Sequence, residues 1–163
     1  MNWFYRLFKE TTRETFSLRW IGLTKIPLLF YVGVSVAEIS PERMVVKIPL
    51  RRRTKNHLGS MYFGVLCAGA DCAAGAFAMY LIRRQPENIS LVFKDFEAQF
   101  LKRAEGDVHF CCSQGQEIAE LVTQATASSE RVERQFEVVA TVPSLSEEPV
   151  ARFKLTLSLK KRP

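Results

Sequence analysis

The stretch that most constrains this chain runs from residue 56 to residue 82 and reads NHLGSMYFGVLCAGADCAAGAFAMYLI. Asp71 is its only formal charge at neutral pH, and basic residues stand immediately before and after it. A segment that is apolar on every side and rich in Ala, Gly and Cys predicts a helix buried all round. A carboxylate in such surroundings is costly unless it is paired or used in chemistry. Asp71 is therefore the first candidate functional residue.

The same stretch is long enough to cross a bilayer, which takes about 20 apolar residues. An Asp near the middle of a spanning helix costs roughly 2.5–3.5 kcal/mol on insertion scales. Segments on both sides also show the two-residue alternation of a sheet, and a span would separate strands that belong together. We therefore expect a core helix and no stable membrane span.

The whole chain has 163 residues and a formal net charge of +6, which predicts one domain over residues 1–163. We expect an N-terminal helix and connector over residues 1–28 and the core of the domain over residues 30–160. The densest basic runs, 51–55 and 160–162, are either solvated strand ends or contacts for an anionic ligand such as a phosphate. No nucleic-acid-binding motif is present, so no nucleic-acid partner is expected.

The four cysteines do not have the spacing of a zinc site, and only two histidines could assist them. Cys67 and Cys72 lie in the apolar stretch and are interpreted as small core residues. We expect no metal, no cofactor, and a reducing, cytoplasmic location. The first ten residues carry charges before an apolar region could form, so no signal peptide is predicted.

Hydrophobic periodicity predicts three helices and six strands. The helices are expected over residues 2–18, about 60–84 and 116–128, with Pro86 ending the second and an irregular stretch up to Pro27 following the first. The strands are expected over residues 31–39, 43–50, 89–101, 107–113, 131–142 and 150–160. In the third strand Val92, Phe96, Ala98 and Phe100 are expected on one side. In the last, residues 151, 153, 155, 157 and 159 should face inward, after a connection from Pro143 to Pro149.

An antiparallel sheet curled around the long helix is the most economical arrangement of these elements, giving an α+β class. One sheet cannot cover a helix that is apolar on all sides. The remaining side must meet the N-terminal helix or another copy, so a homodimer, or a dimer of dimers, is expected. The N-terminal helix has an aromatic face formed by Trp3, Phe4, Leu7, Phe8 and Phe16; packing on the domain is favoured, and a membrane-surface anchor is the alternative.

This order of elements resembles the hotdog fold, and the residues before Asp71 strengthen the likeness. Small hotdog thioesterases acting on acyl-coenzyme A carry an Asn, a Gly three residues later, a His-Gly-Gly, and an Asp seven residues beyond its second Gly. Asn56 and Gly59 match the first two positions, and Asp71 is in register with the acid. Tyr62, Phe63 and Gly64 replace His-Gly-Gly. The HLGSMYFG segment is also similar to a bacterial hotdog family labelled as a domain of unknown function.

The resemblance implies an acyl-thioester hydrolase, with acyl-coenzyme A as the expected substrate. Asp71 would be the general base or nucleophile, because desolvation should raise its pKa and basicity. Unpaired backbone N–H groups at the helix start, from Tyr62 through Phe63 to Gly64, would stabilise the oxyanion. Asn56 would orient water or the carbonyl, and the substrate contacts would come from Tyr62, Gly59, Ser90, Arg52 and Arg53.

Each assignment has a structural alternative. Asp71 could be tied to the backbone of a partner subunit, Asn56 and Ser60 could be turn and N-cap residues, and Tyr62 could be a packed aromatic. The rival hypothesis for the whole protein is a non-catalytic acyl- or lipid-binding hotdog protein, favoured by the loss of His-Gly. It predicts ligand binding without release of free thiol.

Overall fold

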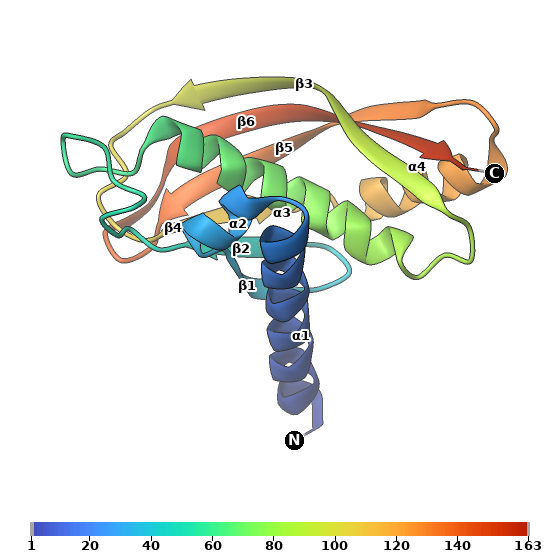
Figure 1. Cartoon of the computed structure of the whole chain (residues 1–163), viewed down its shortest axis with the longest axis horizontal. Helices are drawn as coiled ribbons and strands as arrows, with labels where there is room; N and C mark the ends of the chain where they lie inside the picture. Colours follow the sequence, from blue (N-terminus) through green and yellow to red (C-terminus); the bar gives the residue numbers. More distant parts are fainter. Residues whose placement is uncertain (1, 163) are drawn as a thin grey trace.

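The computed structural model describes residues 2–162, and the side chains of residues 10–162. The chain forms α1 (Asn2–Thr24), α2 (Pro27–Val32), β1 (Ser35–Ile39), β2 (Met44–Ile48), α3 (Phe63–Ile82), β3 (Ile89–Phe100), β4 (Val108–Cys112), α4 (Gly115–Ala127), β5 (Val132–Val142) and β6 (Ser146–Lys161). Six strands in the order β1-β2-β4-β5-β6-β3 make one antiparallel sheet. The sheet curves around α3, while α1 projects away from the body (Figure 1). This is the hotdog arrangement expected from the sequence.

The concave face of the sheet forms the core with α3 and α4. In β6 the residues at 151, 153, 155, 157 and 159 are all buried, as the alternation predicts. Burying a side chain of this kind stabilises the fold by roughly 1.5–3 kcal/mol. Gly69 of α3 has no room for a side chain, since an added Cβ would lie 2.3 Å from the ring of Phe110 on β4. The small residues of α3 thus let the helix lie close to the sheet.

The apolar stretch is a core helix. Of the described helices, α3 is the one that is long and apolar enough to cross a membrane, and 72% of that segment is buried inside the fold. Its predicted ends were too wide: it begins at Phe63 instead of residue 60 and ends at Ile82, four residues before Pro86. Ser60 does not cap the helix; Tyr62 occupies the N-cap position and makes no side-chain cap hydrogen bond.

The predictions for residues 19–34 were wrong. The region expected to be irregular continues α1 to Thr24, and the first part of the expected strand 31–39 belongs to α2. Pro27 lies at the start of α2, where its missing N–H is not needed. Gly33 ends α2 with φ of +73°, a left-handed conformation that suits glycine. Strand β1 therefore begins only at Ser35.

Two further details differ from the expected strands. The register between β3 and β6 shifts between Phe93 and Phe96, so Phe96, Ala98 and Phe100 share the inner face with Leu91 and Phe93. Val92, which pairs with Ser158, lies on the other face, contrary to the alternation read across the bulge. The last connection is also shorter than expected, since β6 begins at Ser146 and contains Pro149.

Helix α1 covers the edge of the sheet at β1 and one side of α3. The Thr15 hydroxyl accepts a hydrogen bond of 2.8 Å from the backbone N–H of Val36 on β1. Glu14 and Leu18 are buried on its inner side. Of the aromatic face expected on this helix, Phe16 is exposed, while the side chains of residues 3, 4, 7 and 8 lie outside the described part of the structure.

Candidate active site

Asp71 lies on the least buried stripe of α3. Gly64, Ala68, Asp71 and Met79 are half-buried and recur at helical spacing, whereas the faces toward the sheet are buried. The stripe faces α1, α2 and the start of the edge strand β3. The one charged residue of the helix thus occupies the side on which a ligand can be reached.

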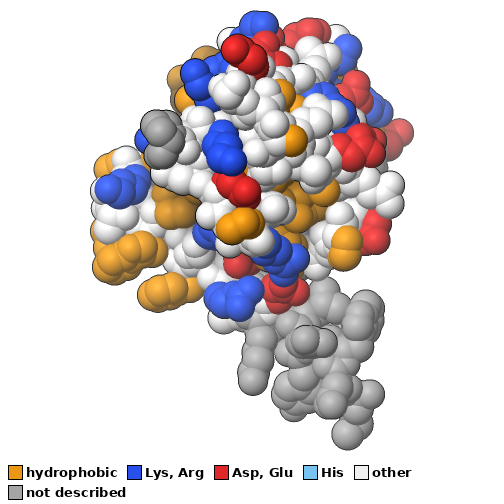
Figure 2. Space-filling model, turned by 90° about the vertical axis from the view of Figure 1, so that its right-hand side faces the viewer, with side chains coloured by type: hydrophobic (Ala, Val, Ile, Leu, Met, Phe, Trp, Pro, Cys, Tyr) orange, Lys and Arg blue, Asp and Glu red, His pale blue; other side chains and the backbone are white. Residues whose placement is uncertain are grey.

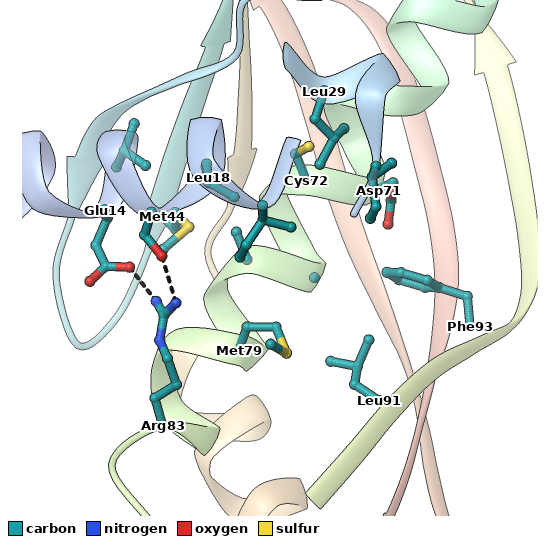
Figure 3. Close-up of a pocket in the computed structure, with 16 residues that line it drawn as sticks. Glu14, Leu18, Leu29, Met44, Asp71, Cys72, Met79, Arg83, Leu91 and Phe93 are labelled. Carbon is teal, nitrogen blue, oxygen red and sulfur yellow. Dashed lines mark hydrogen bonds and ion pairs between the residues drawn. The ribbon is translucent and has the colours of Figure 1, made fainter. Parts of the chain in front are cut away.

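A cavity of about 220 Å³ opens beside this stripe (Figure 3). Its walls are mostly apolar and come from four parts of the chain: Leu18, Ile21, Ile26 and Leu29 of the α1–α2 region; Val36 and Met44 of the β1–β2 hairpin; Cys72, Gly75, Ala76 and Met79 of α3; and Leu91 and Phe93 of β3. Its polar side chains are Asp71, Glu14, Ser17 and Arg83. An apolar cavity with a few convergent polar groups is the usual form of a small-ligand site.

Asp71 lies at one end of the cavity, near Leu29 and Phe93 (Figure 3). A Cβ added to Gly75 would lie 3.1 Å from the Phe93 ring and 3.5 Å from Asp71 Oδ1, so the carboxylate and the ring both border this glycine. Burial raises the pKa of Asp71 from 3.8 to about 6. Among the described residues this carboxylate makes no hydrogen bond or ion pair, and burial is the cause of its raised pKa. Its oxygens are not fully enclosed, since no fully buried side-chain oxygen of the described structure lacks a partner.

The other end of the cavity holds a paired acid. Glu14 of α1 is buried and forms an ion pair with Arg83, which also donates a hydrogen bond of 2.8 Å to Ser17 Oγ. Arg83 follows Asp71 by twelve residues, or about 18 Å along the helix axis. Close by, the Tyr80 hydroxyl donates to Glu10, and the Arg84 guanidinium stacks on the Tyr80 ring at 3.9 Å. These contacts hold α1 on the C-terminal end of α3.

The start of α3 offers free backbone donors. The structure assigns no hydrogen-bond acceptor among residues 2–162 to the N–H groups of Phe63 and Gly64, as expected in a first helical turn. The expectation was wrong for Tyr62, whose N–H donates to the Thr54 carbonyl at 2.9 Å. The ring of Tyr62 lies over Gly64, because a Cβ there would be 2.7 Å from Tyr62 Cε1. The half-exposed Tyr62 and Phe63 rings lie 4.8 Å apart, and Phe63 contacts Phe100 of β3 at 6.1 Å.

A profile for a domain of unknown function, DUF4442, matches residues 14–159. The chain belongs to the DUF4442 family. No match was found among functionally curated proteins.

Solved structures share the fold of this DUF4442 protein at low sequence identity. The protein OLEI01261 of unknown function from Chlorobaculum tepidum TLS matches with a TM-score of 0.80 and 12% identity, over 93% of this chain and 97% of its own. PA5026 from Pseudomonas aeruginosa, named as a probable thioesterase, matches with a TM-score of 0.72 and 22% identity, over 91% of this chain and 96% of its own. Thioesterase HI1161 from Haemophilus influenzae matches with a TM-score of 0.65 and 15% identity, over 87% of this chain and 88% of its own. At these identities the matches establish the hotdog fold.

The loop before α3 in the DUF4442 protein is rigidly built around Asn56. The Asn56 Oδ1 accepts a hydrogen bond of 2.9 Å from the Leu58 N–H, and the Asn56 Nδ2 donates one of 3.0 Å to Ser60 Oγ. Gly59 has φ of +82°, which an L-residue rarely adopts, and its N–H donates to the Asn56 carbonyl. Asn56 and Gly59 thus shape the turn that leads into the helix start.

The predicted substrate-binding arginines separate in the structure. Arg53 lines a polar cleft of about 350 Å³ together with Arg19, Lys47 and Arg51, whereas Arg52 is exposed and does not line it. Lys47 is paired with Asp107 at 2.8 Å. Phe30 is the residue that α2 contributes to this cleft, and the cleft shares no lining residue with the Asp71 cavity.

Ser90 is not brought to Asp71. It lies at the start of β3, next to the end of α3, and its hydroxyl donates to the Lys160 carbonyl at 3.0 Å. The neighbouring Leu91 lines the cavity and Ser90 does not. Sequence reasoning missed three residues of the cavity: Glu14, Arg83 and Phe93. No local sequence pattern pointed to them. Gly75 could have been assigned to the cavity from the sequence, because it lies one turn after Asp71 on the same face of the helix.

Proposed function

We propose that this DUF4442 protein hydrolyses acyl thioesters, most simply acyl-coenzyme A, with Asp71 as the general base or nucleophile. The observation that carries the proposal is an acid with a pKa of about 6 and no partner among the described residues, at the end of an apolar cavity. A raised pKa makes the carboxylate a better base near neutral pH. The names of the structural neighbours PA5026 and HI1161 support the same reaction class.

The reaction needs an attacking group and donors for the developing oxyanion. In one route Asp71 takes a proton from water as the water oxygen attacks the thioester carbonyl; the tetrahedral intermediate collapses, the C–S bond breaks, and the thiolate leaves and takes the proton from Asp71, giving the free acid. In the other route an Asp71 oxygen attacks the carbonyl, and the thiolate leaves and takes a proton from water. The mixed anhydride on Asp71 is then cleaved by water, which releases the acid and restores the carboxylate. The free N–H groups of Phe63 and Gly64 are the donors we assign to the oxyanion.

The spacing within one chain argues for a second copy. Gly64 and Asp71 are seven residues apart, or about 10 Å along the helix axis, too far to reach one carbonyl carbon together. Strand β3 is the edge of the sheet, and Val92, Phe96 and Phe100 are exposed along it. We therefore propose a homodimer, or a dimer of dimers, in which the β3 edges pair and the helix start of one copy faces Asp71 of the other.

The remaining predicted residues take lesser roles in this proposal. Asn56 and Gly59 position the helix start, and the Tyr62 ring moves off Gly64 when the thioester enters. Arg53 with Arg19 and Arg51 holds the phosphates of the carrier, since guanidinium groups bind phosphate well; Arg52 would then add only long-range attraction. No step is assigned to Ser90. Four free cysteines fit a reducing, cytoplasmic location.

The test is release of free thiol from acyl-coenzyme A of several chain lengths. We expect Asp71→Asn to lower kcat/KM by at least a hundredfold, because the base or nucleophile is lost. Glu147→Gln, at an exposed position in the β5–β6 hairpin, is the control and should behave like the wild type. Turnover that survives Asp71→Asn would remove Asp71 from the mechanism. Sedimentation as a monomer at all concentrations would remove the shared site.

The second candidate is a non-catalytic acyl- or lipid-binding protein. It is favoured by the Tyr62 ring over Gly64, which occupies the place where a thioester would approach the helix start. It predicts saturable binding of a fluorescent acyl probe without thiol release. Binding should then survive Asp71→Asn.

A further inference from the structure

Helix α1 has an outward face that the rest of the chain leaves uncovered. Phe16, Trp20 and Leu23 are 70%, 58% and 58% exposed and follow one another at spacings of four and three residues, so they form one stripe. The opposite side of the helix is buried at Glu14 and Leu18. Large apolar side chains gathered on one exposed face indicate an interaction surface.

The apolar surface continues through the turn into α2. Ile26, Leu28, Phe30 and Tyr31 are all exposed as well. Figure 2 shows hydrophobic side chains standing out on the lower left of the surface, with Lys and Arg side chains among them; this is the side nearest the viewer in Figure 1. We call the seven exposed residues from Phe16 to Tyr31 the α1–α2 apolar surface.

The charged residues of the α1–α2 segment itself are all basic after Glu14. Arg13 and Arg19 flank the stripe on α1, and Lys25 follows the end of the helix. Between residues 15 and 32 the sequence contains no Asp or Glu. The two acids before this segment are engaged, Glu14 with Arg83 and, at 3.7 Å, with Arg13, and Glu10 with Arg84. Asp107, which lines a cleft with Arg19 and Phe30, is paired with Lys47. A partner for this surface must therefore offer apolar groups and negative charge.

A second copy of the chain fits this requirement poorly. In a symmetric contact the same surface would lie on both sides, and Arg13, Arg19 and Lys25 would face their counterparts with no carboxylate to pair with. An anionic lipid surface supplies acyl chains and phosphates together. Trp and Tyr favour the membrane–water boundary, since each has an apolar ring and a polar edge.

We propose that the α1–α2 apolar surface docks the protein on anionic membranes, with Phe16, Trp20 and Leu23 entering the interface and the basic residues contacting lipid phosphates. The inner side of the same two helices lines the Asp71 cavity through Leu18, Ile21 and Leu29. Docking would place the cavity next to the boundary where long-chain acyl compounds partition. The proposal does not depend on thioester hydrolysis.

The experiment is co-sedimentation of the full chain with vesicles of phosphatidylcholine alone or mixed with phosphatidylglycerol. We expect binding to the mixed vesicles, little to the neutral ones, and weakening with salt. Phe16→Ser/Trp20→Ser/Leu23→Ser should weaken binding at least tenfold. The matched control Leu58→Ser/Leu145→Ser replaces equally exposed residues elsewhere and should bind like the wild type. Arg13→Gln/Lys25→Gln should weaken binding roughly fivefold per charge removed.

The substituted side chains are exposed, so circular dichroism and thermal unfolding should be unchanged in each variant. Equal binding of the triple variant and the wild type would overturn the proposal. So would a triple variant that changes the sedimenting mass of the protein and leaves vesicle binding intact, because the surface would then meet a second copy. Equal binding to neutral and anionic vesicles would overturn the role of the basic residues.

Discussion

Asp71 and Glu14 line opposite ends of one cavity, and of the two only Glu14 has a cation beside it in the described structure. Glu14 comes from α1 and pairs with Arg83 across the helix interface. Asp71 borders Gly75 and Phe93. Burying a charge without a partner is costly. The cation beside Glu14 therefore favours the ionised form of that acid, whereas the environment of Asp71 disfavours its ionised form.

The difference separates two uses of a buried carboxylate. The pair at Glu14 fixes the position of α1 on α3 and so forms one wall of the cavity. The free carboxylate at Asp71 keeps an oxygen available for a proton or a carbonyl. A buried carboxylate that has no hydrogen bond or ion pair lowers the stability of the fold. Such a cost is expected where the group is kept for its function. The variants below test whether the two acids differ in this way.

The largest expected effect is on the pH dependence of thioester hydrolysis. If Asp71 is the base, its ionised form is active, and kcat/KM should rise with pH around a midpoint of about 6 and then level off. At pH 4.5 roughly one molecule in thirty would carry the ionised form, so the rate should fall about thirtyfold below its plateau. Rates measured from pH 4.5 to 8 with a thiol-independent readout check this. A flat profile would contradict the role of Asp71.

The sequence alone predicted the fold because its signals are local. The α3 helix stood out by composition, and β5 and β6 by strict alternation of inward residues such as Leu155 and Leu157. Errors arose where a local pattern was interrupted. The bulge before Phe96 moved Val92 to the other face, and Pro27 began a helix instead of ending a loop.

The site was predictable only in part, for the same reason. Asp71 was visible as one charge in an apolar helix. The ion pair at the other end of the cavity joins Glu14 and Arg83, which are 69 residues apart in the chain and share no motif. Phe93 reaches the carboxylate through the fold of β3 over α3. Contacts of that kind follow from the tertiary structure and produce no periodic pattern in the sequence.

The next effect tests the paired end of the cavity. Arg83→Gln should lower the free energy of unfolding by about 2 kcal/mol, because the buried Glu14 carboxylate loses its closer partner and keeps only the more exposed Arg13 at 3.7 Å. Adding Glu14→Gln should recover part of this loss, since no uncompensated charge then remains. Chemical denaturation measures both. Lys94→Gln, which breaks an exposed pair with Glu133, is the control; a loss as small for Arg83→Gln would show that the Glu14 pair is not structural.

An effect of opposite sign on stability is expected at Asp71. Its pKa is higher in the folded protein than the ordinary 3.8, so between pH 3.8 and about 6 the folded state binds more protons than the unfolded state. Stability therefore falls as pH rises through this window. Asp71→Asn removes this cost and should stabilise the protein by up to about 3 kcal/mol at pH 8 relative to its effect at pH 3.5, because one pKa unit corresponds to about 1.4 kcal/mol. Thermal unfolding at the two pH values measures the difference, and an equal effect at both would mean that Asp71 carries no burial cost.

The smallest expected effect is that of Gly75→Ala, which changes the surroundings of Asp71 and leaves the Glu14 end of the cavity unchanged. The Cβ of Gly75→Ala would lie 3.1 Å from the Phe93 ring and 3.5 Å from Asp71 Oδ1. Crowding of Phe93 opposes the gain of up to about 1 kcal/mol that Ala brings to a helix, so the net change in stability should be close to zero. The added methyl excludes water from the carboxylate, and the midpoint of the pH–rate profile should rise by a few tenths of a pH unit. Ser17→Ala changes the paired end of the cavity and should leave the midpoint where it is; a shift there of equal size would mean that the two ends are not electrostatically separate.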